Sequence, residues 1–283
     1  MESPPWDFRK FNDPAGFFEQ FFGADSDADR EKLERTELSL AEERAFGNRV
    51  AQAFLAELRR NDVTVTSRGK DVDYLRRLVG CVQPVMEHAE RYSSWQIYIA
   101  EANPLEAKCF PGGTLVFFRG MLDSAESEAT LVGVVAHELS HVDHGHQLNM
   151  LRRMKIAEQT FSGRQGFDPR SMFQNGPMLL RAFLRPFRPE DESQADLDAT
   201  RWMFKLGYNP REFAKLFLRM KKAAGPPVGL AAILPSHPPH ADRNRAVLKE
   251  LDELTAAAPD QRLYVGRENL RRRLTRAEKE FAE

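Results

Sequence analysis

The feature that most constrains this chain is an apolar run that ends in two histidines. Residues 131–136 read LVGVVA, and His137–His141 follows as HELSH. Residues four apart lie on one face of a helix, about 6 Å apart along its axis, so both imidazoles can bind one metal ion. Burying such polar groups at the end of an apolar helix is costly without a purpose of this kind. We therefore predict a buried central helix over Ser127–His146 that carries a metal site.

The spacing of these residues is that of the H-E-x-x-H motif, in which both histidines bind zinc and the glutamate acts as general base. Glu138 can take a proton from water and later hand it to a leaving amine. Chance is the competing explanation, because a chain with seven histidines shows this pattern in roughly one or two cases per hundred. The apolar run before the motif favours the first interpretation, so we predict one Zn²⁺ per chain.

A catalytic zinc site needs a third protein ligand and one open position. Glu192–Asp196 reads ESQAD and offers two carboxylates one helical turn apart. Glu192 can bind the metal, and Asp196 can accept the N–H of a ligand imidazole and fix its tautomer. On its own, Glu192 would be interpreted as an acid that interacts with a helix dipole. Beside the HELSH motif, the ligand interpretation is favoured.

A third stretch, residues 235–239, reads PSHPP and is followed by Arg243. Prolines stiffen the loop around His237, which suits a histidine that donates a hydrogen bond to a tetrahedral oxyanion. An ordinary surface histidine is the alternative, and spacing alone does not separate the two. Arg243 either orients a carboxylate, supports the oxyanion, or lies on a helix surface.

Together these stretches resemble the M48 family of zinc metallopeptidases. The apolar runs are too short for the roughly 20 residues that span a bilayer, so the soluble BepA/LoiP-like branch fits better than the membrane branches, which include HtpX and the CAAX prenyl proteases. The matching stretches occur in family order: LSLAEERAFG (38–47), PGGTLVFFRGML (111–122), LVGVVAHELSHVDHGH (131–146), ESQADLDATRWMFKLGYNP (192–210) and SHPPHADR (236–243).

The resemblance implies a role for each residue of the predicted site. It implies that His137, His141 and Glu192 bind zinc and that Glu138 is the general base. It implies that Asp196 supports a ligand imidazole from behind.

The resemblance extends to residues around this site. His237 matches a histidine that either steadies the oxyanion or approaches the metal in a resting state. Arg243 matches an arginine of the same loop and helix, and His146 matches a histidine to which we assign a structural role.

The resemblance also implies that an extended substrate pairs with an edge strand formed by Gly112, Gly113, Thr114 and Leu115. The stretch before these residues, Glu106–Phe110, departs from the family pattern through its lysine and cysteine. We therefore do not carry over a substrate preference from the family.

The rest of the chain predicts helices around a few strands. Trp95–Ala100 and Thr114–Phe118 are β-branched and aromatic, as strands are. Glycines and prolines interrupt residues 147–188, which we predict to be irregular. The expected fold is α+β, mostly α: a gluzincin-like metallopeptidase domain whose small sheet has an edge strand beside the active-site helix. Further helices are predicted over Thr36–Arg60, Asp71–Ala89, Asp191–Leu206, Pro210–Ala224 and His240–Ala258.

Residues 1–35 differ from the predicted peptidase domain, residues 36–283. They carry six phenylalanines, with nine acidic and five basic residues, whereas residues 147–188 carry eight basic and two acidic residues. This complementarity suggests the hypothesis that residues 1–35 dock on residues 147–188 as a lid over the active site. Packing on the core far from zinc, contact with a membrane surface and contact with a second subunit are the alternatives.

Composition narrows the partners and leaves the compartment open. Forty-one Lys and Arg against 42 Asp and Glu give no field that attracts nucleic acid, and Arg271–Arg273 is a short basic run between acids. Two cysteines, Cys81 and Cys109, exclude a disulfide scaffold and leave either one bridge or two thiols. The first residues lack the pattern of a secretory signal. The chain as written is therefore expected in the cytoplasm, or in the periplasm or cell envelope if a leader was removed.

We predict a zinc metalloendopeptidase that hydrolyses extended or unfolded protein segments, with protein quality control as the role by analogy with the family. A protein or peptide is the expected substrate, and the oligomeric state is open. A zinc amidohydrolase or deaminase is one rival, although it needs a closed small-molecule pocket. A latent or chaperone-like binding protein with a plugged zinc site is the other.

Overall fold

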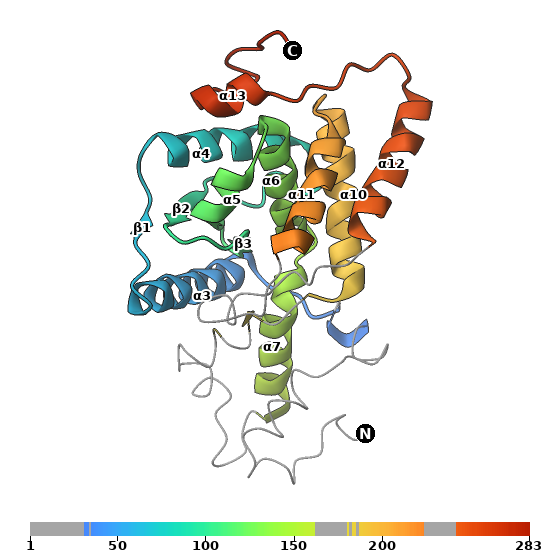
Figure 1. The fold of residues 1–283 in the computed structure, drawn as a ribbon. Helices are drawn as coiled ribbons and strands as arrows, with labels where there is room; N and C mark the ends of the chain where they lie inside the picture. The colour runs from blue at the N-terminus through green and yellow to red at the C-terminus, as the bar shows by residue number, and fades with distance from the viewer. Residues whose placement is uncertain (1–30, 34, 162–179, 181–182, 185–186, 224–241) are drawn as a thin grey trace.

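The structure is a computed structural model that describes residues 31–33, 35–161, 180, 183–184, 187–223 and 242–283. Helices surround a small sheet (Figure 1), which confirms the predicted α+β, mostly α fold. The helices are α3 (Leu40–Arg60), α4 (Lys70–Val82), α5 (Arg119–Ser124), α6 (Glu128–Asp143), α7 (Asn149–Phe161), α10 (Pro189–Lys205), α11 (Pro210–Ala223), α12 (Arg243–Ala257) and α13 (Arg267–Arg272). The strands are β1 (Val65–Thr66), β2 (Gln96–Ala100), β3 (Ala107–Phe110) and β4 (Thr114–Phe118).

Helix α6 lies at the centre of the molecule, and all of its 16 residues are buried. Its N-terminus is capped by Ser127, whose side chain accepts a hydrogen bond from the backbone N–H of Thr130. The helix ends before Gly145, which takes the left-handed conformation at φ 64° that glycine adopts without strain. The predicted helix over 127–146 is thus confirmed, although the observed helix is shorter than predicted at both ends.

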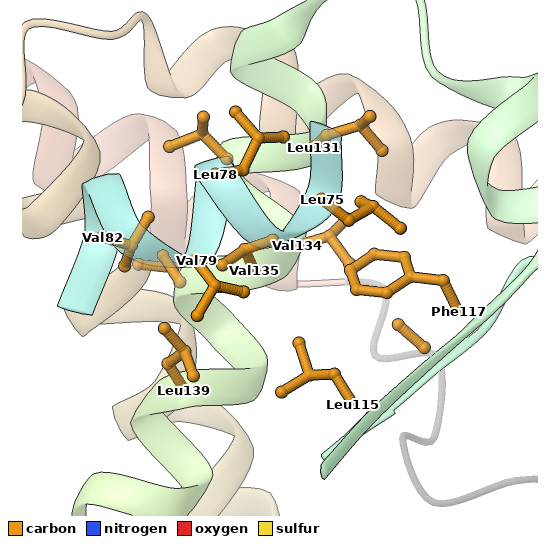
Figure 2. Close-up of a cluster of buried hydrophobic side chains, with 14 of the residues drawn as sticks. Leu75, Leu78, Val79, Val82, Leu115, Phe117, Leu131, Val134, Val135 and Leu139 are labelled. Atoms are coloured by element: carbon orange, nitrogen blue, oxygen red, sulfur yellow. The ribbon is translucent and has the colours of Figure 1, made fainter. Parts of the chain in front are cut away.

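The main core packs α6 against both α4 and the sheet. Figure 2 shows Leu75, Leu78 and Val79 of α4 on one side of Val135, with Leu115 of β4 nearby. Each such side chain, when fully buried, contributes about 1.5–3 kcal/mol relative to exposure. This packing holds the helix, and with it the HELSH motif, in one position.

The strand order is β1-β2-β4-β3, with β2 and β4 parallel and β3 and β4 antiparallel. Thr114 and Leu115 lie in β4, which pairs on both sides, and Gly112 and Gly113 form the turn before it at φ 87° and 89°. The prediction that these four residues form the substrate-pairing edge strand is therefore wrong. The edge beside α6 belongs to β3, because the glycine turn folds the preceding residues back along the outside of β4.

Helices α10 and α11 pack against α6, and α12 packs against both of them (Figure 1). Gly133 allows the close approach of α11, because a Cβ atom there would come within 2.6 Å of the Phe213 side chain. Any larger residue at position 133 would push α11 away from the HELSH segment. The sequence therefore positions α11 against the active-site helix through this one small residue.

Two predictions about the remaining segments differ from the structure or fall outside it. Residues 147–188 were predicted to be irregular, but α7 occupies Asn149–Phe161 and buries Met150, Met154 and Ile156. Of residues 1–35, the structure describes 31–33 and 35, so the lid stays a hypothesis. Both cysteines are free thiols. None of the helices in the described ranges is long and apolar enough to cross a membrane.

Candidate metal centre

Three buried side chains converge where α6 and α10 meet. His137 and His141 project from one face of α6, and Glu192 lies in the first turn of α10. Their ligand atoms all lie within 4.8 Å of one another. The two Nε2 atoms are 3.2 Å apart, and Glu192 Oε1 is 3.5 Å from His141 Nε2. The structure thus brings together all three predicted ligands.

Asp196 lies behind His137, one turn along α10 from Glu192. Its Oδ1 is 3.0 Å from His137 Nδ1. Burial alone would raise the pKa of Asp196, but hydrogen bonds with His137 and Arg243 outweigh it and lower that pKa. An ionised carboxylate only accepts hydrogen bonds, so His137 carries its proton on Nδ1 and directs the Nε2 lone pair into the cluster.

His146 lies behind His141 as Asp196 lies behind His137. Its Nδ1 lies 2.9 Å from His141 Nδ1, and burial lowers the pKa of His146 to about 4. A neutral His146 can accept the Nδ1 proton of His141, which turns the His141 Nε2 lone pair toward His137. Two lone pairs this close favour a cation between them. Two imidazoles and a carboxylate form a donor set of catalytic zinc, so the residues fit that metal.

Arg243 joins the two carboxylates of α10. Its Nε and Nη2 each donate to Asp196 at 2.7 Å, and its Nη1 lies 2.9 Å from Glu192 Oε2. The guanidinium also lies 4.4 Å from the ring centroid of Phe217. All three nitrogens face carboxylates, so the geometry favours a residue that orients carboxylates over one that holds an oxyanion.

Replacing Arg243 by alanine should lower the free energy of unfolding of the metal-free protein by about 3–5 kcal/mol, because Asp196 and Glu192 lose their buried counter-charge. Treatment with a chelator gives the metal-free protein. Urea unfolding measures this loss. Arg245, two residues along the same helix, pairs with Asp242 in solvent; Arg245→Ala should cost at most about 1 kcal/mol. Equal losses for the two variants would contradict the assigned role of Arg243.

The predicted general base, Glu138, is held by the edge strand. Its Oε2 accepts a hydrogen bond of 2.9 Å from the backbone N–H of Cys109 in β3. The Cys109 carbonyl in turn accepts a hydrogen bond from the Gln147 side chain. Sequence analysis missed both contacts, because a backbone donor leaves no residue-type signal and β3 lacks the usual β-branched residues.

Three described residues between 183 and 187 lie beside the same cluster. The Phe187 ring stacks on His141 with a centroid distance of 4.0 Å and an interplanar angle of 13°. The Phe183 ring stacks on Phe110 of β3 at 5.2 Å. Together with Leu184 and Lys108 they line a small cavity beside Glu138. Phe183, Leu184 and Phe187 therefore lie beside the metal cluster and Glu138.

A polar network supports the same stretch of α6 from the side. Asp198 of α10 accepts hydrogen bonds from Ser140 at 2.8 Å and pairs with His144 at 2.7 Å. The hydrogen bond with Asp198 raises the pKa of His144. Burial alone would raise the pKa of Asp198, but hydrogen bonds with His144 and Ser140 lower it. His144 thus ties α6 to α10 and does not join the metal ligands.

This pair should make stability depend on pH. His144 adds to the free energy of unfolding while its imidazole is charged, and this stabilisation disappears as pH rises through the raised pKa of His144. Asp198 adds to the free energy of unfolding while its carboxylate is ionised. This stabilisation is present above about pH 4 and disappears as pH falls through the lowered pKa of Asp198. His144→Gln should therefore lower the free energy of unfolding of the metal-free protein by about 1 kcal/mol at pH 6 and by less at pH 9. An equal loss at both pH values, measured by urea unfolding, would contradict the pairing.

His237 lies outside the described residues, so its predicted role stays a prediction. Among the described residues, the structure juxtaposes Glu138 and Arg243 with the three candidate ligands. A helix with this motif, a third candidate ligand on α10 and an edge strand beside the helix are the arrangement of a metallopeptidase-type site. The chain belongs to peptidase family M48, whose family model matches residues 74–251.

The chain is also similar to two curated metalloendopeptidases. It is 25% identical over 153 residues to the mitochondrial metalloendopeptidase OMA1 of Arabidopsis thaliana, covering 54% of this chain and 30% of the relative. It is 24% identical over 160 residues to the protein of the same name from Schizosaccharomyces pombe, covering 56% of this chain and 47% of the relative. The matched region thus spans less than half of each relative.

Proposed function

We propose that this protein is a zinc-dependent metalloendopeptidase that hydrolyses peptide bonds in extended or unfolded protein segments. The observation that carries the proposal is the buried cluster of His137, His141 and Glu192 beside Glu138. Membership of family M48 and the similarity to two metalloendopeptidases support it. The BepA/LoiP-like branch and a role in protein quality control stay predictions.

The residues around the cluster divide the chemistry among them. Zinc held by the three ligands would supply Lewis acidity that polarises the peptide carbonyl and acidifies water. Glu138 accepts the proton of the attacking water and delivers it to the leaving nitrogen. Asp196 and His146 hold the ligand imidazoles in the tautomer that leaves Nε2 free. His237 is proposed to donate a hydrogen bond to the oxyanion.

The edge of β3 supports an extended substrate. The backbone N–H and C=O of Cys109 face away from β4, because its neighbours Lys108 and Phe110 make the ladder hydrogen bonds in the register that pairs them with Val116 and Thr114. A substrate backbone added at this edge would run directly past Glu138. Strand addition selects unfolded or extended chains, because folded segments do not expose free backbone groups.

A digest of an unfolded protein such as casein tests the proposal. The zinc-loaded protein should release peptides, and Glu138→Gln should not. A mass spectrum that shows no zinc-dependent product from the wild type would contradict the activity. Binding of unfolded protein without any cleavage would point to the second candidate function.

That second candidate is a latent or chaperone-like protein whose zinc site is plugged. The stacking of Phe187 on His141 and the hydrogen bond from Gln147 to the Cys109 carbonyl favour it, because both occupy places that a substrate would need. A latent peptidase and a pure binding protein differ in what happens when this cover is removed.

Phe187→Ala should raise the rate of peptide hydrolysis if the cover restricts access, while the zinc content stays the same. While Phe187 covers the site, its ring stacks on His141, which stabilises the covered state by about 0.5–1.5 kcal/mol. Loss of this stabilisation should raise the population of the open site, and with it the rate, about 2- to 13-fold. Hydrolysis of a fluorogenic peptide measures this change. An unchanged rate in the zinc-loaded variant would show that Phe187 does not restrict the site.

A further inference from the structure

The side chain of Gln147 fills a hydrogen-bonding position at the β3 edge that an added strand would use. Gln147 lies in the short 3-10 helix η3 (His146–Leu148), which follows Gly145 at the end of α6. Its Nε2 donates a hydrogen bond to the Cys109 carbonyl, which faces away from β4. A carboxamide carries a donor and an acceptor, as a peptide group does. Gln147 therefore stands beside Cys109 as one peptide group of a neighbouring strand would.

The other polar atom of this side chain, Oε1, is buried and unpaired. Gln147 is 8% exposed, and no donor of the described residues lies within hydrogen-bond distance of Oε1. A buried acceptor without a partner is costly, and about nine in ten buried polar groups have one. The fold thus holds one acceptor in place beside the β3 edge for a donor that it does not itself supply.

Gln147 and Glu138 line the same small cavity next to the metal cluster. Its volume of about 10 Å³ is about the space that one water molecule needs, so it takes a single polar group and no side chain. As a general base, Glu138 is ionised and only accepts hydrogen bonds. Two acceptors in the wall favour a hydrogen-bond donor as the occupant. The other residues that line the cavity are Lys108, Cys109, Phe183, Leu184 and Phe187.

We propose that Gln147 binds the substrate, with Oε1 accepting one backbone N–H of the extended chain that lies along β3 beside Glu138. The assignment rests on the proposed peptidase function and adds a residue that recognises the substrate backbone. Nε2 occupies the edge acceptor, the Cys109 carbonyl, and Oε1 offers an acceptor in its place. Every residue except proline has a backbone N–H. The contact therefore fixes the register of the chain relative to Glu138 and excludes proline at one position.

The residues on either side of Gln147 hold it in place relative to the metal cluster. His146 lies 2.9 Å from His141 through their Nδ1 atoms, and Leu148 is 1% exposed. The backbone N–H of Leu148 donates to the Gly145 carbonyl at 2.9 Å. One short helix thus carries both the histidine behind a candidate zinc ligand and the glutamine. The position of Oε1 is therefore tied to that of the ligands.

Gln147→Met removes the donor and the acceptor and keeps an unbranched side chain of similar length. Methionine adapts well to irregular space in a protein interior, so the variant should fold. Gln52 is exposed on α3 and does not line the cavity; Gln52→Met is the matched control. Gln147→Leu takes the place of Gln147→Met if circular dichroism shows that the methionine variant is unfolded.

The first measurement is peptide binding to the zinc-loaded Glu138→Gln protein, followed by fluorescence anisotropy. Each peptide of a series has one backbone N–H replaced by an ester oxygen, at a different position. At one position the ester should weaken binding about tenfold, as loss of the partner of a buried acceptor does. With Gln147→Met added, the all-amide peptide should bind about tenfold more weakly, and that ester should cause no further loss. With Gln52→Met added, the full ester effect should remain.

Three results of this measurement would overturn the assignment. The first is that every ester effect is the same with and without Gln147→Met. The second is that Gln147→Met binds the all-amide peptide more tightly, which would make Gln147 part of the cover over the site. The third is that no peptide of the series binds.

The second measurement separates the role of Gln147 from the activity. Peptides released from casein by the wild type and identified by mass spectrometry should lack proline at one fixed position relative to the cleaved bond. Gln147→Met should accept proline there. The same proline pattern in both proteins would overturn the role of Gln147 and leave the peptidase function standing. An ester effect that requires Gln147, without any cleavage of casein by the wild type, would support the binding role and contradict the peptidase function.

Discussion

Glu138→Gln should abolish measurable hydrolysis while the protein keeps its zinc. Glutamine has the same shape and can still accept the hydrogen bond from the Cys109 N–H, but it cannot take a proton from water. Loss of a general base costs about 10²–10⁴ in rate. Cleavage of a fluorogenic peptide and zinc content by plasma mass spectrometry give the two readouts.

A matched control for this variant is Glu126→Gln, which changes an exposed glutamate paired with Arg219 before the start of α6. It should retain both zinc and hydrolysis. If Glu138→Gln hydrolyses the peptide at the wild-type rate, another group is the base. If it loses zinc as well as hydrolysis, Glu138 belongs to the metal ligands instead.

Glu192→Ala should remove zinc from the protein. Two imidazoles remain, and Arg243 then faces the cluster without one of its two carboxylates, so both ligand loss and cation repulsion weaken binding. We expect a larger loss of affinity than the about 10–100-fold typical of residues that support a ligand from behind. Competition with a chromophoric chelator measures the zinc affinity.

Two other variants on α10 calibrate this result. Glu190→Ala changes an exposed acid in the same first turn and should leave zinc affinity unchanged. The zinc affinity of Asp196→Ala should lie between those of Glu190→Ala and Glu192→Ala, because Asp196 contacts His137 and is not one of the three candidate ligands. Full zinc occupancy in folded Glu192→Ala would contradict the ligand assignment.

Much of the candidate site was predictable from the sequence because helical geometry determines it. The spacing of His137 and His141 places both on one face of any helix, and the apolar run before them predicts that the helix is buried. Glu192 and Asp196 are one turn apart for the same reason. That Arg243 binds both carboxylates was only one of the alternatives, since it depends on how α12 packs against α10.

The contacts that sequence analysis missed arise from tertiary structure. The edge strand was assigned to the β-branched stretch at Thr114, but strand order depends on a turn that places Ala107–Phe110 outside it. The hydrogen bond to Glu138 comes from the Cys109 backbone, so no residue type announces it. The helix α7 was missed because glycines and prolines further along dominated the composition of residues 147–188.

The most direct test of the account is to remove zinc from the protein and return it. Chelation should stop the hydrolysis of unfolded casein, and about one equivalent of zinc per chain, the stoichiometry of a three-ligand catalytic site, should restore it. The same addition should restore nothing to Glu138→Gln. Hydrolysis that persists after complete chelation, or a fully loaded wild-type protein that cleaves no casein, would contradict the assignment as a zinc metalloendopeptidase.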